Sequence, residues 1–260
     1  MAIAEFFSDS EWGLQMFFFR FQKGTIKVFS DSTKGLQKFF SESEWGLRMS
    51  NAYKTVWADL DGSLVSEIKF KPSESSYSAL VKDSLNVDLS YSRRNSLRTL
   101  LGTKIVFEAR RRKDIDVILL AANEAQARQI LPQLRFHKAE DVPIFSSSHV
   151  YSRFDNKTNN KDLEGLTFGD VPWIAGEKNY FLRKVLEQTQ HPANNYPRLF
   201  AFGRDAFSIL PFLHRMEISP YLKIPGATGD LWLDSERVIH RDLKWFYFKN
   251  GKPRWLGPKS

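Results

Sequence analysis

The sequence predicts an α/β fold that ends in β-hairpins. The clearest indication is the unbroken apolar run Val117–Ala122, which is followed at once by a helical pattern over residues 124–134. A continuous apolar strand with a helix directly behind it is typical of a central parallel strand, because helices cover both faces of such a sheet. The tail, residues 229–255, has alternating stretches and the turn pairs Ser235-Glu236 and Asn250-Gly251, which predict hairpins.

A strand-helix-strand unit is predicted in the first quarter of the chain. Apolar residues recur at helical spacing across Trp45–Leu60, with Ser43 as the N-cap and Gly62 where the helix would end. Phe39-Phe40 would end the strand before this helix, and Leu64–Phe70 would form the strand behind it. Such a unit supports the α/β class.

Further elements follow from one-sided apolar patterns. A short link after residues 124–134 leads to the strand Val142–Phe145, as a right-handed crossover requires. Further helices are predicted around residues 77–85, 92–101, 180–189 and 198–213, the last of them interrupted near Pro211.

Four tandem copies of an eleven-residue segment occupy residues 6–49, with Phe and Gly at equivalent positions. Eleven residues suffice for a strand and a turn, and only the last copy continues into a helix. The same period can indicate a right-handed supercoil, but the glycines and phenylalanine clusters disfavour a long helix. Residues 1–38 are therefore predicted to be redundant strand-turn repeats, whose identical strands compete for one position in a sheet.

Composition excludes several classes of protein. The chain has 260 residues, 42% of them hydrophobic, and a net charge of +8, which are ordinary values for a folded protein. With no cysteine there is no disulfide, thiol nucleophile, thiolate metal site or lipidated cysteine. Acidic residues near the start, such as Glu5 and Asp9, argue against a secretory signal. No apolar run approaches the roughly 20 residues of a membrane-spanning helix, so we expect no transmembrane segment.

The segment VIHRDLK, residues 238–244, duplicates the start of a protein-kinase catalytic loop. Such a loop needs an Asn five residues after its Asp, and Tyr247 stands there instead, so we interpret the segment as a hairpin strand. The five histidines show no metal-ligand spacing, and no glycine-rich phosphate loop is present. We therefore predict no catalytic residue, no metal site and no cofactor.

Small hydroxyl side chains follow the strand Val142–Phe145 at Ser146, Ser147 and Ser148. No G-x-S-x-G turn is present to expose a nucleophile. Ligands of open α/β folds bind outside the carboxyl ends of strands, so these serines and the turn near Gly203 form a candidate ligand cleft. A plain polar turn is the alternative.

Positive charge is concentrated between Arg93 and Lys113. Eight basic residues against Glu108 alone give this segment +7, nearly the whole net charge of the chain. A single aromatic residue, Phe107, is too few for a base-stacking platform, so nucleic acid is not the expected partner. An acidic protein face and an anionic envelope polymer are equally suitable partners for this charge. The further alternative is that the segment is a solvated face without a partner. The candidate partner-binding residues are Arg93, Arg94, Arg98, Arg110, Arg111, Arg112 and Lys113.

Long co-linear stretches resemble the LpoA/LppC family, outer-membrane lipoproteins that activate a class A penicillin-binding protein. They include residues 110–152, DLEGLTFGDVPWI (162–174), YPRLFAFGRDAFSIL (196–210) and GATGDLWLDSERVIHRDLKWFYFKNGKPRWL (226–256). The resemblance therefore covers about residues 39–256 and explains VIHRDLK as an ordinary hairpin segment.

The resemblance implies a type I periplasmic-binding-protein-like fold of two lobes. Residues 39–141 would form the second α/β lobe, residues 142–217 the crossover and a remnant of the first lobe, and residues 218–260 the return to the second lobe with β-hairpins. The family also has a lipobox cysteine after a signal peptide, an amino-terminal helical domain and opening elements of the first lobe, none of which this sequence shows. We therefore expect an incomplete first lobe with exposed sheet edges and apolar helix faces.

The implied function is non-enzymatic activation of a class A penicillin-binding protein by docking, at the periplasmic face of the outer membrane. Peptidoglycan is a further candidate partner. The alternative is a periplasmic module that binds a small ligand through Ser146, Ser147, Ser148 and Gly203.

Overall fold

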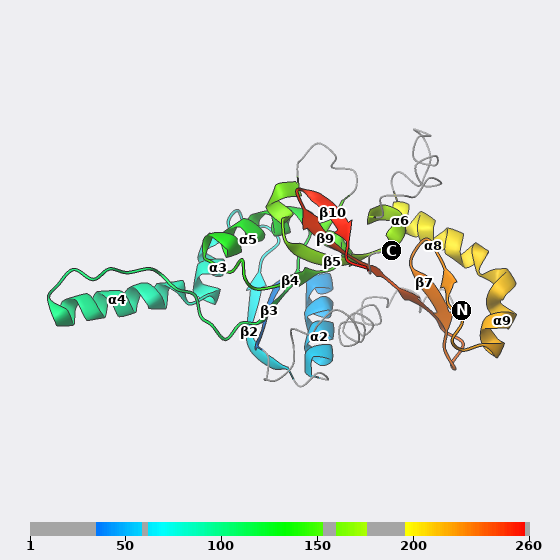
Figure 1. The fold of residues 1–260 in the computed structure, drawn as a ribbon, viewed down its shortest axis with the longest axis horizontal. Coiled ribbons are helices and arrows are strands. Elements are labelled where there is room, and N and C mark those ends of the chain that lie inside the picture. The colour runs from blue at the N-terminus through cyan, green and yellow to red at the C-terminus, as the bar shows by residue number, and fades with distance from the viewer. Residues whose placement is uncertain (1–34, 59–61, 153–159, 176–195, 258–260) are drawn as a thin grey trace.

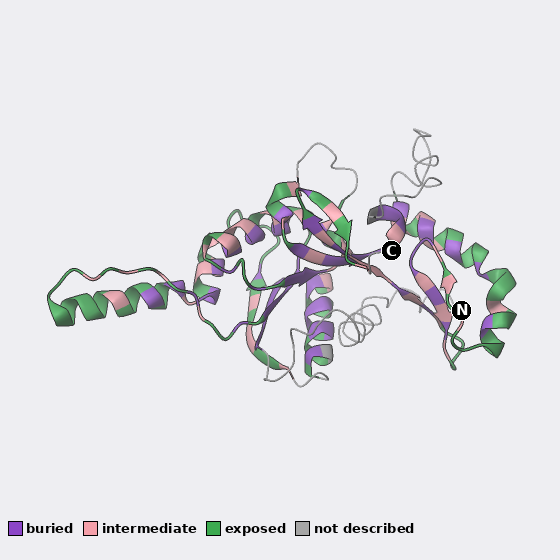
Figure 2. Ribbon diagram, in the orientation of Figure 1, coloured by how far each residue is buried: buried purple, intermediate pink, exposed green. Residues whose placement is uncertain are grey.

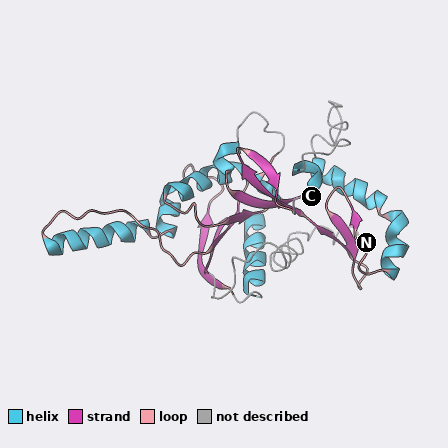
Figure 3. Cartoon of the chain, viewed as in Figure 1, coloured by secondary structure: helices cyan, strands magenta, loops and turns pink. Residues whose placement is uncertain are grey.

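Two lobes of unequal size make up the computed structural model, which describes residues 35–58, 62–152, 160–175 and 196–257 (Figures 1 and 3). The larger lobe holds a seven-stranded sheet in the order β10-β9-β5-β4-β3-β1-β2, and the smaller lobe holds a three-stranded sheet in the order β6-β7-β8. The repeats within residues 1–34 and the helix predicted at 180–189 lie outside the described residues.

Strands of the larger sheet are parallel from β2 to β5, while β9 runs antiparallel to β5 and β10 runs antiparallel to β9. In chain order the strands are β1 (Gly35–Ser41), β2 (Ser63–Phe70), β3 (Val117–Ala121), β4 (Ile144–Ser146), β5 (Leu166–Asp170), β6 (Ile224–Pro225), β7 (Asp230–Leu233), β8 (Ile239–Asp242), β9 (Lys244–Lys249) and β10 (Lys252–Trp255).

Helices lie on both faces of the larger sheet and along one side of the smaller lobe (Figure 1). They are α2 (Glu44–Ala58), α3 (Ser78–Ser84), α4 (Val87–Leu101), α5 (Glu124–Phe136), α6 (Pro172–Ala175), α8 (Pro197–Ser208) and α9 (Leu213–Ile218), with the 3₁₀ helices η4 (Ser148–Val150), η5 (Asn160–Leu163) and η7 (Leu210–Phe212).

The central strand β3 is buried on both faces, as its apolar run predicts. Val117, Leu119 and Ala121 pack in one core cluster with residues of α2. Ile118 and Leu120 pack in a second cluster with residues of α3 and α5. This alternation places α2 on one face of the sheet and α3 and α5 on the other, which is the layering of a parallel α/β fold.

Local signals in the sequence are confirmed at several element ends. The Ser43 hydroxyl accepts a hydrogen bond from the Gly46 amide at 3.1 Å at the start of α2. Asn250 and Gly251 both have positive φ values, 53° and 68°, which is the geometry of a type I′ hairpin turn between β9 and β10. Helix α8 ends before Pro211, as predicted, and the chain continues through η7 into α9.

Lys38, on β1, places a charged side chain in the interior of the larger lobe. Its side chain is buried, and its ammonium group lies 2.7 Å from Glu67 Oε1 and 3.1 Å from the Ser50 carbonyl oxygen. Burial lowers the pKa of Lys38, although the pairing with Glu67 opposes that effect. The hydrogen bond from Lys38 in turn lowers the pKa of the Glu67 carboxyl. The pair thus connects β1 to both β2 and α2.

The expected domain boundaries differ from the observed division of the chain. β1 begins at Gly35 and so crosses the expected boundary after residue 38. β4 and β5 belong to the larger sheet, whereas the family resemblance places residues 142–217 in the crossover and the first lobe. The reason is pairing: β4 pairs with β3, β5 pairs with β4, and the chain leaves this sheet only after Asp170.

The return to the larger lobe also comes later than residue 218. Strands β6, β7 and β8 pair with one another in the smaller lobe, so the hairpin at Ser235-Glu236 lies there and only the β9–β10 hairpin lies in the larger sheet. Strand β8 confirms that VIHRDLK is a hairpin segment. The chain crosses back at Leu243, between the end of β8 and the start of β9.

The smaller lobe exposes the apolar helix surface that the sequence predicts. Figure 2 shows α8 and α9 largely exposed along their outer side. The large apolar residues exposed on this surface include Leu199, Phe207, Leu210, Ile218 and Tyr221. Among the described residues, the three-stranded sheet and its helices leave these side chains uncovered.

We expect Phe168→Ala to destabilise the larger lobe by about 3–5 kcal/mol, the usual cost of removing a buried aromatic ring. Phe168 is fully buried and packs against Tyr151, Phe246 and Phe248, with ring centroids 5.1–5.8 Å apart. The matched control is Phe207→Ala, since Phe207 is 77% exposed. Urea unfolding should show a loss within about 0.5 kcal/mol for the control. Equal losses in the two variants would contradict this core assignment.

Candidate functional site

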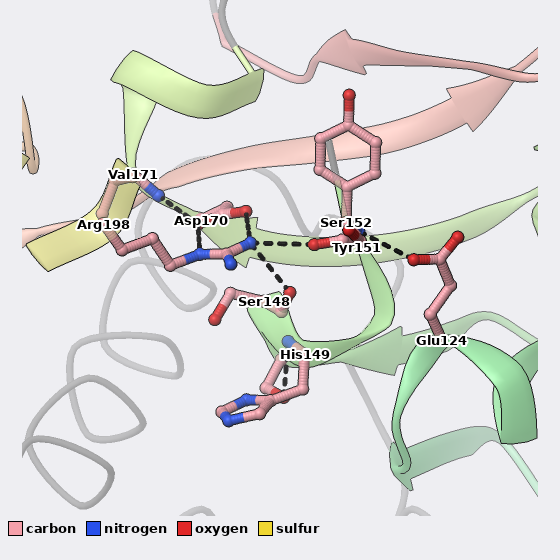
Figure 4. A network of polar contacts seen from close by, with 9 residues as sticks. Glu124, Ser148, His149, Tyr151, Ser152, Asp170, Val171 and Arg198 are labelled. Carbon is pink, nitrogen blue, oxygen red and sulfur yellow. Dashed lines mark hydrogen bonds and ion pairs between the residues drawn. The ribbon is translucent and has the colours of Figure 1, made fainter. Parts of the chain in front are cut away.

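An ion pair between a buried carboxylate and a partly exposed arginine joins the two lobes at the carboxyl end of the larger sheet (Figure 4). Asp170, the last residue of β5, is fully buried. Arg198, in the first turn of α8, donates to it from Nε to Oδ1 at 3.0 Å and from Nη2 to Oδ2 at 2.7 Å. The same Nη2 donates to the carbonyl oxygens of Ser148 at 3.1 Å and Tyr151 at 2.9 Å. One guanidinium group thus fixes α8 against the segments that follow β4 and β5.

Electrostatics of this pair are governed by burial. Removal from water raises the pKa of the Asp170 carboxyl, while Arg198 and the hydrogen bond from the Val171 amide at 2.7 Å offset part of that rise. Burial opposes the charge of Arg198 as well, but its hydrogen bonds and attraction to Asp170 dominate and raise the pKa of the guanidinium. The paired hydrogen bonds between the guanidinium and the carboxylate fix the orientation of α8 relative to the end of β5.

The three serines predicted as a ligand cleft serve the local backbone. Ser146 donates its hydroxyl to the Leu120 carbonyl oxygen at 2.6 Å, and the Ser147 hydroxyl caps η4 by accepting from the His149 amide at 3.4 Å. The carbonyl oxygen of Ser148 is used by Arg198. These contacts bind β4 to β3 and shape the turn. They agree with the alternative given for these serines, a plain polar turn without a ligand.

Gly203 lies apart from those serines. It is exposed on α8, more than one helical turn beyond Arg198. A shallow hollow of about 490 Å³ adjoins it and is lined by Leu199, Phe200, Gly203 and Arg204. None of the three serines lines this hollow, so the structure does not assemble the predicted ligand cleft from both parts.

His149 is a residue of this region that the sequence analysis did not single out. Its ring lies 4.2 Å from the ring of Trp45 at the start of α2, measured between centroids. Desolvation lowers the pKa of the imidazole, and the positive charge of Arg198 lowers it further. Both effects disfavour the charged form of His149, whose ring forms an aromatic contact between η4 and α2.

The basic segment forms an arm that projects from the larger lobe (Figure 1). Helix α4 runs outward and residues 102–113 return beside it. Arg93 and Arg98 on α4 are exposed, and so are Arg110 and Lys113 on the returning segment.

Arg94 and Arg112 are partly covered. Arg94 packs over the ring of Phe107 at 5.4 Å, and Arg112 pairs with Asp114 at 2.5 Å. Both side chains therefore already have contacts within the arm and its root. The positive charge of Arg112 is paired with the carboxylate of Asp114.

Arg111 is predicted to belong to the docking surface, but the structure shows that it is not available to a partner. Its side chain is buried, and its Nη2 lies 2.8 Å from both carboxylate oxygens of Asp141. Its Nε donates to the Lys138 carbonyl oxygen at 3.0 Å. The hydrogen bond from Arg111 lowers the pKa of Asp141. Arg111 therefore fastens the root of the arm to the segment after α5 and presents no charge to a partner.

Apolar residues on α4 are the second feature that the sequence analysis missed. Leu89, Leu97, Leu100 and Leu101 are all exposed, although they recur at helical spacing. That spacing could have been noticed in the sequence, but it normally indicates a buried face.

The described part of the chain contains no helix long and apolar enough to cross a membrane. Within the same residues, no group of three or more His, Cys, Asp or Glu side chains is placed to hold a metal ion.

We expect Arg198→Met to destabilise the protein by about 3 kcal/mol at neutral pH, because it leaves the Asp170 carboxylate buried without its partner. Adding Asp170→Asn should recover part of the loss. A carboxyl whose folded pKa is raised stabilises the folded state below its unfolded pKa and loses that contribution as the pH rises. The deficit of the single variant should therefore shrink as the pH falls toward 3.8, the ordinary aspartate value.

Urea unfolding of the unmodified protein, the single variant and the double variant at several pH values measures this. A deficit of Arg198→Met that is the same at pH 4 and pH 7, or a double variant as unstable as the single one, would contradict the role given to the ion pair.

Comparison with known proteins identifies the family. The family model described as "LppC putative lipoprotein" matches residues 22–251. The penicillin-binding protein activator LpoA of Photobacterium profundum is 25% identical over 204 residues, which are 77% of this chain and 33% of that protein. The protein of the same name from Klebsiella pneumoniae is 25% identical over 213 residues, 79% of this chain and 30% of that protein. The chain thus spans about a third of the length of these curated relatives.

Solved structures show the same fold. Full-length LpoA from Haemophilus influenzae matches with a TM-score of 0.64 at 16% identity, over 95% of this chain and 39% of that one. The LpoA C-domain from the same organism, described as a regulator of PBP1A, matches with a TM-score of 0.60 at 15% identity, over 95% and 67%. A putative branched-chain amino acid ABC transporter from Rhodospirillum rubrum matches with a TM-score of 0.61 at 17% identity, over 95% and 65%.

These structural matches confirm the predicted α/β fold of the periplasmic-binding-protein type. The family match includes β1 to β9 and the turn that follows them, so it takes in most of both lobes. On this evidence the chain belongs to the family of LppC lipoproteins.

Proposed function

We propose that this chain is a non-enzymatic docking module of the bacterial envelope that activates a class A penicillin-binding protein. The observation that carries the proposal is the α4 arm, which holds exposed arginines and exposed leucines away from the body of the larger lobe. Relatives named penicillin-binding protein activator support it, although the chain spans about a third of their length. By the same resemblance its place of action is the periplasmic face of the outer membrane.

Activation by such a module needs no bond chemistry. Binding that favours the active conformation of the synthase over its inactive one supplies a coupling free energy of typically 1–3 kcal/mol. The arm suits this role because its helix is already folded and backed by its own returning segment, so little ordering is required on binding. Its flanking charges can accelerate encounter with an acidic surface.

The alternative, binding of a small periplasmic ligand, has less support from the geometry. Transporter-type proteins share the fold, but likeness at such low identity shows the fold alone. The Ser146 and Ser147 hydroxyls are committed to backbone contacts, and Gly203 lies elsewhere. Peptidoglycan remains a candidate second partner through the same exposed cations.

Charge reversal of the arm tests the proposal. We expect Arg93→Glu combined with Arg98→Glu and Arg110→Glu to weaken binding to a purified class A penicillin-binding protein by about tenfold or more at low salt, through a slower association rate. The deficit should shrink as salt increases, since exposed charges are screened. Surface plasmon resonance at two ionic strengths measures affinity and rates, and glycan polymerisation by the synthase measures activation.

The control reverses Lys249 and Lys252, which are exposed beside the hairpin at the far edge of the larger sheet. This control should bind and activate as the unmodified chain does. Arg111 is left unchanged because reversing it would break its buried pair with Asp141. Unchanged affinity of the arm variant would remove the arm from consideration as the docking surface.

A further inference from the structure

The outer face of α4 carries leucines that the described residues leave uncovered. Leu100 is 80% exposed, Leu101 61%, Leu89 53% and Leu97 49%. At 100° per residue these four positions fall within an arc of about 120° on one side of the helix. An apolar face of this kind on a projecting helix is a recognised signature of a binding surface.

Part of α4 is packed by the arm itself, at Ser90 near the root and at Tyr91 on another side of the helix. The Ser90 hydroxyl accepts a hydrogen bond from the Arg110 amide at 3.2 Å, and the rings of Tyr91 and Phe107 lie 5.3 Å apart. At its tip the helix ends at Gly102, whose φ of 64° suits glycine and whose amide donates to the Arg98 carbonyl oxygen at 3.1 Å. The helix therefore ends in a regular cap within the arm, while Leu97, Leu100 and Leu101 stay exposed among the described residues.

Charge limits what can cover this face. Between Leu89 and Phe107 the chain has four cations, Arg93, Arg94, Arg98 and Lys104, and no acidic residue. Two copies packed through their α4 helices would bring these cations together without compensating carboxylates, which disfavours self-association. A complementary partner must offer an apolar groove with acidic side chains at its rim.

We propose that Leu97, Leu100 and Leu101 are the anchors of a helix-in-groove contact with the synthase, in a groove rimmed by carboxylates. The spacing i, i+3, i+4 is that of helices which bind apolar grooves. This inference rests on the proposed function and specifies its contact surface: the leucines supply the buried contact, Arg93 supplies a charge within the apolar arc, and Arg98 supplies a charge beside it.

A protein groove fits the arm better than a lipid surface does. Helical periodicity places Arg93 between Leu100 and Leu97 within the apolar arc. A bilayer would have to bury that guanidinium among acyl chains, whereas a groove can present it with a carboxylate. The exposed arc also lacks the aromatic side chains common on interfacial helices.

The test compares two sets of exposed apolar residues in the intact chain. The arm variant is Leu97→Gln with Leu100→Gln and Leu101→Gln, and the control is Phe207→Gln with Leu210→Gln, which are 77% and 58% exposed on the smaller lobe. Binding to a purified class A penicillin-binding protein is measured at moderate salt. We expect the arm variant to bind about tenfold more weakly or worse, mainly through faster dissociation, and the control to bind normally.

Each of the other outcomes would overturn a specific claim. Normal binding by the arm variant while the unmodified chain binds would overturn this inference alone, whereas no binding by the unmodified chain would overturn the proposed function as well. An equal loss in the control would overturn the assignment of the anchors. So would light scattering that shows a dimer broken by the arm variant, or leucine-dependent binding to phosphatidylglycerol vesicles.

Discussion

The contact between Asp170 and Arg198 determines how the two lobes are joined. A carboxylate with no exposed surface at the end of β5 is tolerable only with a cation beside it, and that cation belongs to the first turn of α8. Because the same guanidinium also binds the backbone of Ser148 and Tyr151, the smaller lobe is fastened to the carboxyl edge of the larger sheet. Open α/β folds bind ligands at that edge, and here the chain's own arginine occupies part of it.

Within the smaller lobe, a second buried carboxylate compensates for a thin core. Asp205 on α8 accepts hydrogen bonds from the amides of Ala227 and Thr228, both at 2.7 Å, and from the Thr228 hydroxyl. These bonds hold the loop before β7 against the helix, where the apolar clusters of the described residues are small. The lobe therefore depends on polar contacts to keep its shape while its outer helix surface stays exposed.

Elements with strong local signals could be predicted from the sequence. β3 and α5 follow from an apolar run and a one-sided helix, and Ser43 marks the start of α2, because these signals act over a few neighbouring residues. Strand β5 could not be predicted in this way. Its sequence contains Gly169, and its burial depends on pairing with Trp245 and its neighbours in β9, far along the chain.

The candidate site shows the same limit. In the run Arg110-Arg111-Arg112 the three side chains are chemically identical, yet Arg111 is buried because Asp141 from a later loop meets it. Likewise the spacing of Leu97, Leu100 and Leu101 is the same whether a helix faces a core or solvent, so only the projection of the arm reveals their exposure. Local patterns specify elements, and long-range partners decide which of their side chains remain available.

The burial of the Lys38 amine provides a way to measure how often the larger sheet opens. Its amine is enclosed between β1, β2 and α2 and held by Glu67 and the Ser50 carbonyl oxygen. An acylating reagent can reach that amine only when the edge strand β2 or α2 separates from β1, whereas surface lysines react at once. The rate at which Lys38 is labelled, read by peptide mass spectrometry, therefore reports how often this corner of the folded protein opens.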